Sequence, residues 1–550
     1  MRKFLASLMV VLLLLTLVAC GSSGGAESGV DSAAPELSAP NSAAESDVPA
    51  STTTGGETTG TTTDGKNPPK TPSELTTTTT TTTAAVNTQE DKPFTGNSAI
   101  LWDGQHSSYD AQAEALRQSI LKTKDTVKAS TTGNTYYVSY KGNDANDGLT
   151  PATAWRSTKK VGAMFFPENT TVLFERGGVY RGMMKNVVSG MSIGAYGSGS
   201  KPQLYGGARN YADESLWLKT KTANVWRLYV GTSGDIGNIV FDHGKECSGP
   251  GKKLSASKLA QDYDFCHDTR NGYIYLYLSK GNPGKLHESI EVTPIGSIIG
   301  SSKSPKNVTI DNLCLKYANF GIAFSGVENI TITNCEIGWI GGCYNGSDCR
   351  WGNGIELFAA VDGATIKNNW IYQCYDAGYT NQDDGNRLET DIVVSNNLIE
   401  YCNYNIEVFV GASIGGKVTD TVYEKNILRF AGYGFGSYSR WGSDTSQVGH
   451  IRATSNLDGC PCENFIIRNN VFDCSAYQLV NSSQYDGVKG PLFTGNTWIQ
   501  NDAENAFTAQ VLVNATDPAV KKLPAKDQKT MEASVAIVDK NATVIFEKKK

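Results

Sequence analysis

Two glutamates, Glu356 and Glu407, stand in segments of similar pattern, at 354–357 and 405–408. Side chains of a β-strand alternate between its two faces, so both glutamates point outward if the isoleucine before each points inward. Glycoside hydrolysis uses such a pair, because one carboxylic acid protonates the leaving oxygen while one carboxylate acts on the other side of the sugar ring. We therefore expect Glu356 and Glu407 to be a catalytic acid and base.

Further acidic, polar and aromatic residues lie near these glutamates in the sequence. We expect Asp376 and Asp383 to assist catalysis or bind substrate, and Asp383 with Asp384 to be the ligands of any metal ion. Aromatic faces pack against sugar rings, and polar side chains bind hydroxyl groups. The predicted substrate-binding residues are Trp351, Tyr379, Gln382, Tyr438, Arg440, Trp441 and His450.

A repeated sequence motif places the two glutamates at equivalent positions of their repeats. A β-branched run ends in an asparagine-containing pair at 334–335, 368–369, 396–397, 425–426 and 469–470, with fainter copies at 312 and 495–496. Such self-similarity predicts a solenoid of stacked coils. Parallel strands lie about 4.8 Å apart, so Glu356 and Glu407 are roughly 10 Å apart at the backbone, with Tyr379 between them in the same outward row.

The repeated asparagines are predicted to be scaffold. Their amides bond the backbone and the equivalent residues above and below, and asparagine tolerates left-handed turns. Two coils are long because they carry insertions, at 342–353 and 440–463. Solenoids display function on such insertions, so the loops that carry Trp351 and Trp441 should flank the glutamates.

Three segments carry a family resemblance: YYVSYKGNDANDG (136–148), GGVYRG (177–182) and AYGSGSKP (195–202). They resemble the opening of right-handed parallel β-helix proteins of the pectate lyase-like superfamily. The resemblance covers 136–501 and implies an all-β solenoid, without specifying a reaction. Residues 217–292 lack the repeat and resemble a β-rich insertion found in several carbohydrate-active β-helix proteins.

Other readings of the same outward face remain open. A polysaccharide lyase would need a basic residue beside a uronic acid, for which Arg440, Arg452 and His450 are available, and acidic side chains to hold calcium. The pairs 383–384 and 449–450 also resemble polygalacturonases, but the further residues of that motif do not match. A non-catalytic glycan-binding or adhesion protein and a passive spacer are the remaining alternatives.

The first twenty residues resemble a bacterial lipoprotein signal, with Arg2 and Lys3 before an apolar run that ends at Leu-Val-Ala-Cys. This resemblance implies cleavage before Cys20, lipid attachment to its thiol and an extracytoplasmic, cell-surface location. Residues 21–97 are rich in Thr, Ser and Gly and should form a disordered tether.

The folded part should begin with an N-terminal cap at 98–134 that contains a helix at 108–124. We expect the β-helix at 135–504. A C-terminal cap and tail at 505–550 should follow, with strands at 535–538 and 544–546.

Charge and cysteine content limit the partners. A formal net charge of -6 argues against nucleic acid. We expect a monomer that binds a polysaccharide, contacts the membrane through its lipid anchor alone and requires no cofactor, with calcium as the exception in the lyase reading.

Of the 12 cysteines, Cys374 and Cys402 fall at equivalent places and should stack inside the coils, and Cys343 and Cys349 are spaced for a local disulfide.

Overall fold

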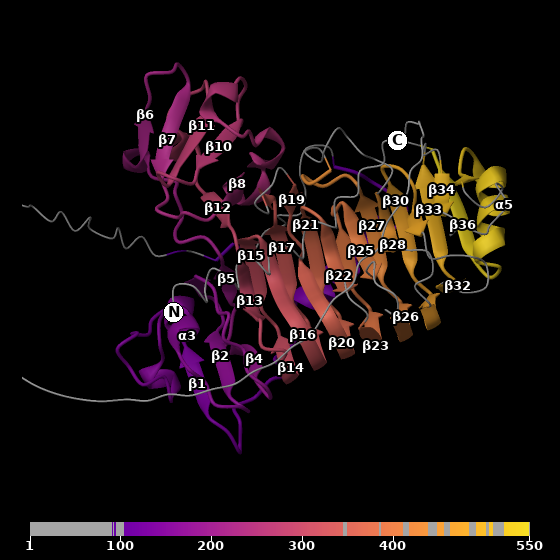
Figure 1. Cartoon of the computed structure of the whole chain (residues 1–550), viewed down its shortest axis with the longest axis horizontal. Coiled ribbons are helices and arrows are strands. Elements are labelled where there is room, and N and C mark those ends of the chain that lie inside the picture. Colours follow the sequence, from indigo (N-terminus) through magenta and orange to yellow (C-terminus); the bar gives the residue numbers. More distant parts are fainter. Residues whose placement is uncertain are drawn as a thin grey trace, which may run out of the picture. The chain divides into compact units, whose positions relative to one another are not determined.

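The computed structural model describes residues 91, 93–94, 104–344, 349–383, 387–410, 417–437, 448–455, 462–482, 491–501, 505–509 and 522–548. Within these residues, two long sheets run side by side along a solenoid (Figure 1). Their strands pair in parallel from coil to coil, except that β34 and β35 are antiparallel. The fold is a right-handed parallel β-helix, as the sequence predicts.

The first sheet contains β1 Thr135–Val138, β2 Thr171–Glu175, β4 Ser192–Tyr196, β13 Ser297–Ser301, β14 Lys306–Asp311, β16 Phe320–Thr333, β20 Ile355–Lys367, β22 Ala377–Asp383, β23 Leu388–Ser395, β25 Tyr404–Val410, β26 Lys417–Glu424, β28 Gly449–Ser455, β29 Cys462–Arg468, β31 Val480–Ser482, β32 Leu492–Thr494, β34 Asn505–Ala509 and β35 Lys522–Pro524. The second contains β3 Val179–Arg181, β5 Gln203–Tyr205, β15 Cys314–Ala318, β17 Glu336–Ile340, β21 Trp370–Cys374, β24 Leu398–Glu400, β27 Ile427–Ala431, β30 Val471–Ser475, β33 Thr497–Asn501 and β36 Thr543–Glu547.

The core is built from side chains that stack in register between coils. One such stack runs through Ile310, Ile332, Ile366, Val394, Tyr423 and Ile467. All of these side chains are buried. Burial of apolar area at each coil stabilises the solenoid, which explains why the apolar alternation recurs with every repeat.

The second residue of the asparagine pairs forms a continuous internal ladder. Each side-chain Nδ2 donates to the Oδ1 of the next member, through Asn369, Asn397, Asn426, Asn470 and Asn496. The last Nδ2 donates to the carboxylate of Asp539 at 2.9 Å. The first residue of each pair has a positive φ, such as 57° at Asn368. The structural role predicted for these asparagines is therefore confirmed.

The insertion is β-rich, as predicted (Figure 1). A four-stranded antiparallel sheet has the order β10 Phe265–Asp268, β11 Tyr273–Tyr277, β7 Val225–Tyr229 and β6 Trp217–Lys219. A three-stranded sheet contains β12 Ile290–Pro294, β8 Ile236–Phe241 and β9 Glu246–Cys247. A short hairpin, β18 Cys343–Tyr344 and β19 Arg350–Trp351, belongs to the first inserted loop of the solenoid. The short helix α4 Pro283–Leu286 belongs to the insertion, whereas the short helix α3 Thr158–Ala163 precedes it in the sequence.

The N-terminal segment is not the end cap that the sequence led us to expect. Its helix, α2 Asp110–Leu121, is present, but it lies along the second sheet. Arg117 Nη2 bonds Glu400 Oε1 of β24 at 2.7 Å, and Ser107 Oγ donates to Asp473 of β30 at 2.7 Å. We call residues 104–128 the strap, because they bind several coils at once.

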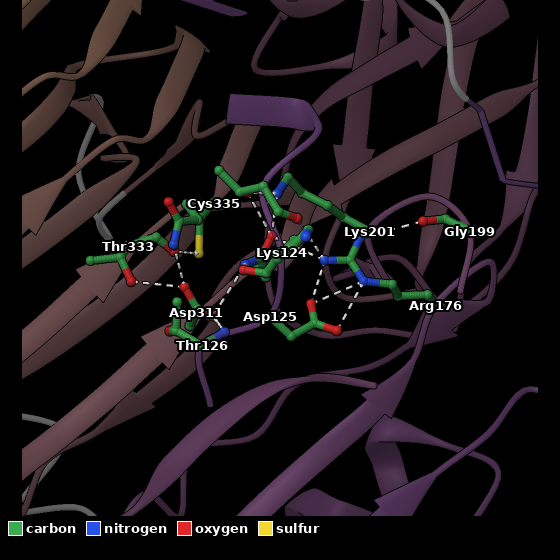
Figure 2. A network of polar contacts seen from close by, with 12 residues as sticks. Lys124, Asp125, Thr126, Arg176, Gly199, Lys201, Asp311, Thr333 and Cys335 are labelled. Carbon is green, nitrogen blue, oxygen red and sulfur yellow. Dashed lines mark hydrogen bonds and ion pairs between the residues drawn. The ribbon is translucent and has the colours of Figure 1, made fainter. Parts of the chain in front are cut away.

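A polar network fastens the other end of the strap to the first coils (Figure 2). Arg176 Nε donates to Asp125 Oδ1 at 3.0 Å. The buried carboxylate of Asp311 accepts from the backbone N–H of Thr126 at 2.9 Å and from the hydroxyl of Thr333 at 2.9 Å. The strap therefore supplies hydrogen-bond partners to Arg176 and Asp311 of the first coils.

The C-terminal cap combines a helix with a strand. Residues 535–538 belong to helix α5, Gln528–Val538, so the predicted strand there is wrong, whereas 544–546 lie in strand β36 as predicted. A short apolar run does not distinguish helix from strand, and here Met531, Val535 and Val538 are buried at helical spacing. Within the described residues, no helix is long and apolar enough to cross a membrane.

The cysteines only partly match expectation. Cys374 and Cys402 are buried free thiols that contact each other, as the stacking prediction requires. Cys343 is also a buried free thiol, whereas Cys349 is disulfide-bonded. The predicted local disulfide between Cys343 and Cys349 is therefore wrong.

Candidate active site

Four residues of the first sheet form an outward row across neighbouring strands. Glu356 of β20 pairs with Thr380 of β22, which pairs with Glu407 of β25, which pairs with Arg452 of β28. The residue before each of these is apolar and buried, and it points into the core. We call this set the carboxylate row. It places the two glutamates on one face, with a single strand between them.

Tyr379 does not belong to this row. It pairs with Ile355 and Ile406, the core residues on either side, and it is fully buried. A shift of one residue along a strand moves a side chain to the opposite face. The expected substrate contact at Tyr379 is therefore corrected, and Thr380 takes the outward position.

Glu356 lies in an environment that disfavours its charge. Burial raises its pKa to about 7, although a hydrogen bond from Asn353 Nδ2 to Glu356 Oε2, 2.7 Å long, acts in the other direction. The negative charges of Asp376 and Glu407 raise the pKa further. Asn353 is itself fixed, because its Oδ1 accepts from the backbone N–H of Ala377 at 2.8 Å. The proton of Glu356 is therefore held to a higher pH than that of an ordinary glutamic acid.

Glu407 lies in an environment that favours its charge. Arg452 Nη1 donates to Glu407 Oε1 at 2.6 Å, and Gln382 Nε2 donates to Oε2 at 2.9 Å. Glu407 is only 4% exposed, and a guanidinium in contact with a carboxylate favours its ionised form. Arg452 is held over the ring of Tyr404, with 4.7 Å between guanidinium carbon and ring centroid.

The row therefore contains one carboxyl group whose pKa is raised by burial and another that is paired with a guanidinium. Two carboxyl groups whose environments separate their protonation states can serve as acid and base in one reaction. The strands that carry them are separated by two strand spacings, roughly 10 Å at the backbone. This arrangement is suited to protonating one atom while a carboxylate acts on another.

Two further predicted residues, Asp376 and Gln382, act on the row, and a third, Trp351, lies in the loop that carries Asn353. The charge of Asp376 acts on Glu356, and Gln382 binds Glu407 as described. Trp351 is partly exposed and packs edge-on against Phe320, with ring centroids 5.2 Å apart. It precedes Asn353 by two residues, so the loop that carries the indole also positions the hydrogen bond to Glu356.

Asp383 and His450 are both buried and do not face the row. Asp383 accepts a hydrogen bond from the backbone N–H of Arg387 at 2.8 Å. His450 contacts Asn405 at 2.9 Å and stacks on Phe472, and burial, together with the charge of Arg429, lowers its pKa to about 3. The expected direct contacts of Asp383 and His450 with substrate are therefore corrected to internal positions.

The remaining predicted site residues, Asp384, Tyr438, Arg440, Trp441 and Cys20, lie outside the described residues. Within the described part of the chain, no three His, Cys, Asp or Glu side chains are grouped so as to hold a metal ion. The sequence reasoning missed Asn353 and Thr380, and it considered Arg452 only as a lyase residue. The strand register identifies all three.

The fold and the carboxylate row define a right-handed parallel β-helix with a candidate acid and base pair on its outer face.

No family model matches the chain, and no curated protein matches it. Similar solved structures include XylC in complex with xylose, at 12% identity over 68% of this chain and 69% of that chain, with a TM-score of 0.36. The GH136 lacto-N-biosidase from Eubacterium ramulus has 15% identity over 76% of this chain and 67% of that chain, with a TM-score of 0.32. Pectate lyase Pel9A has 11% identity over 72% and 80%, with a TM-score of 0.33. The parallel register of the strands, rather than these similarities, establishes the fold class.

Proposed function

We propose that this protein hydrolyses glycosidic bonds of a polysaccharide. The observation that carries the proposal is the contrast between Glu356, whose pKa burial raises to about 7, and Glu407, which is paired with Arg452. Glycoside hydrolysis requires this combination of a protonated and an ionised carboxyl group.

In this proposal, Glu356 donates its proton to the glycosidic oxygen as the bond to the sugar breaks. Glu407 takes a proton from a water molecule that attacks the opposite side of the sugar carbon. The two strand spacings between the residues, roughly 10 Å at the backbone, leave room for that water, and a carboxyl separation of about 6.5 to 9.5 Å gives inversion. Asn353 and Arg452 act as positioning residues.

The experiment compares Glu356→Gln and Glu407→Gln with the parent on a panel of neutral and acidic polysaccharides. Glu328→Gln is the matched control, because Glu328 is an exposed glutamate on the same sheet. We expect new reducing ends with the parent and the control, and a loss of on the order of 10² or more in rate with either site variant. Full activity of both site variants on a cleaved substrate would disprove the assignment.

The same assay separates the lyase and the binding protein. A lyase produces an unsaturated sugar that absorbs in the ultraviolet, and a binding protein retains a glycan without new ends. A lyase is less favoured, because Arg452 is engaged by Glu407 and His450 is buried.

We also propose that Cys20 is lipidated after signal cleavage and anchors the protein at the cell surface. Cys20→Ser should release it into the medium, and protease added to intact cells should digest the anchored parent.

A further inference from the structure

The four-stranded sheet of the insertion has one covered face and one partly exposed face. Trp217, Leu228, Ile274 and Leu276 are buried in a core of their own on the covered face. Alternation along β6, β7 and β11 directs the intervening residues to the opposite face. We call that surface the tyrosine face, and it contains Leu218, Arg227, Tyr229, Tyr273, Tyr275 and Tyr277.

Three side chains of the tyrosine face, Arg227, Tyr229 and Tyr273, are in contact with one another. Tyr229 is 61% exposed and packs on Tyr273, with ring centroids 5.1 Å apart. The guanidinium carbon of Arg227 lies 5.2 Å from the ring centroid of Tyr273. Leu218, opposite Arg227 in register, is 49% exposed. The result is a packed tyrosine pair beside a guanidinium and an exposed leucine on the surface of the sheet.

The charge on this face points to the class of ligand. Among the described residues, Arg227 forms no ion pair with an acidic side chain, although it is exposed. Asp268, which pairs with Tyr273, accepts hydrogen bonds within its own turn from Asn271 Nδ2 and the backbone N–H of Arg270, and the positive charge of Arg270 acts on it. An unpaired guanidinium beside aromatic rings is complementary to a ligand that carries carboxylates next to apolar ring faces.

We propose that the tyrosine face binds an anionic polysaccharide, a chain that contains uronic acids, as a site separate from the carboxylate row. The tyrosine rings pack against the C–H faces of the sugars, their hydroxyls bond sugar hydroxyls, and Arg227 binds a carboxylate. The insertion then holds a glycan on the protein, whether or not the carboxylate row cleaves it.

The experiment is affinity electrophoresis of the intact protein in gels containing polygalacturonate, alginate, glucuronan or neutral xylan. All proteins carry Glu356→Gln, so that the probe is not consumed. The test variants are Tyr273→Ala and Arg227→Gln. The matched control is Phe165→Ala, because Phe165 is 98% exposed and lies outside the insertion. Thermal melting confirms that each variant is folded.

We expect at least one polyuronate to retard the parent, and added salt to reduce the effect. Tyr273→Ala and Arg227→Gln should each weaken binding about tenfold or more, which corresponds to about 1.4 kcal/mol, while Phe165→Ala binds as the parent does. Retardation by none of the polyuronates, stronger retardation by xylan, or equal binding by Tyr273→Ala would overturn the proposal. The compared proteins are identical in the carboxylate row and differ only at the tyrosine face or at Phe165, so a difference in retardation between them reports on the tyrosine face whether or not the hydrolase proposal holds.

Discussion

Arg452 binds the carboxylate of Glu407 at 2.6 Å, whereas Glu356, in the same outward row, receives its hydrogen bond from the neutral amide of Asn353. Within the described residues, Glu356 has no ion pair. This asymmetry gives two chemically identical side chains different electrostatic environments. It leads to predictions that separate catalysis from structure.

Activity should fall as the pH rises through about 7. The general acid must hold its proton, and burial together with the neighbouring charges of Asp376 and Glu407 raises the pKa of Glu356 to about 7. We expect the alkaline limb of kcat/KM to have its midpoint there. Asp376→Asn removes one of the charges that raise the pKa, so it should move this limb to lower pH. A limb that stays in place would show that another group supplies the proton.

Arg452→Met should reduce kcat by on the order of 10², because Glu407 then loses the cation that stabilises its ionised form. The acid limb of the pH profile should move to higher pH in the same variant. Arg468→Met is the matched control, since Arg468 forms an ion pair with Glu424 and is 44% exposed. Equal kinetics of the two variants would contradict a role for the pair of Arg452 and Glu407.

Asn397→Ala should destabilise the solenoid without direct effect on the site. Its amide makes hydrogen bonds to Asn426 and to the carbonyl of Ile366, and its removal leaves buried partners unsatisfied. We expect a loss of about 2 to 4 kcal/mol in the free energy of unfolding, measured by denaturant titration. Asn541→Ala, at an exposed turn, should change it by less than about 0.5 kcal/mol.

The strap should contribute stability at neutral pH that is lost in acid. Hydrogen bonds from Thr126 and Asn334 hold the pKa of Asp311 below its usual value, although burial acts in the other direction. A carboxyl group with a lowered pKa stabilises the fold above its unfolded-state pKa, and this stability disappears as the pH falls through the folded-state value. Asp311→Asn should therefore be less stable than the parent at pH 7, and the difference should shrink near pH 3. A difference that does not depend on pH would show that packing, and not charge, is responsible.

Much of the fold was predictable from local pattern. The asparagine pairs, the apolar alternation and the turn geometry recur with every coil, so each copy reports the same stacking requirement and together they indicate a solenoid. The positions of Glu356 and Glu407 followed from the isoleucine that precedes each of them. Residues 535–538 were misassigned as a strand because four apolar residues carry no period of their own.

The sequence by itself determined that the chain forms a β-helix and that two glutamates share its outer face, because these features depend on side-chain alternation and repetition within single segments. Only the tertiary structure decided that Tyr379 points inward, that the strap lies along the second sheet and that Arg452 binds Glu407. Those outcomes depend on contacts between residues far apart in the sequence and on burial by several coils at once. Glu407 and Arg452, for example, are 45 residues apart in the sequence. The different environments that make the two glutamates a candidate acid and base arise from that three-dimensional arrangement, which no single segment encodes.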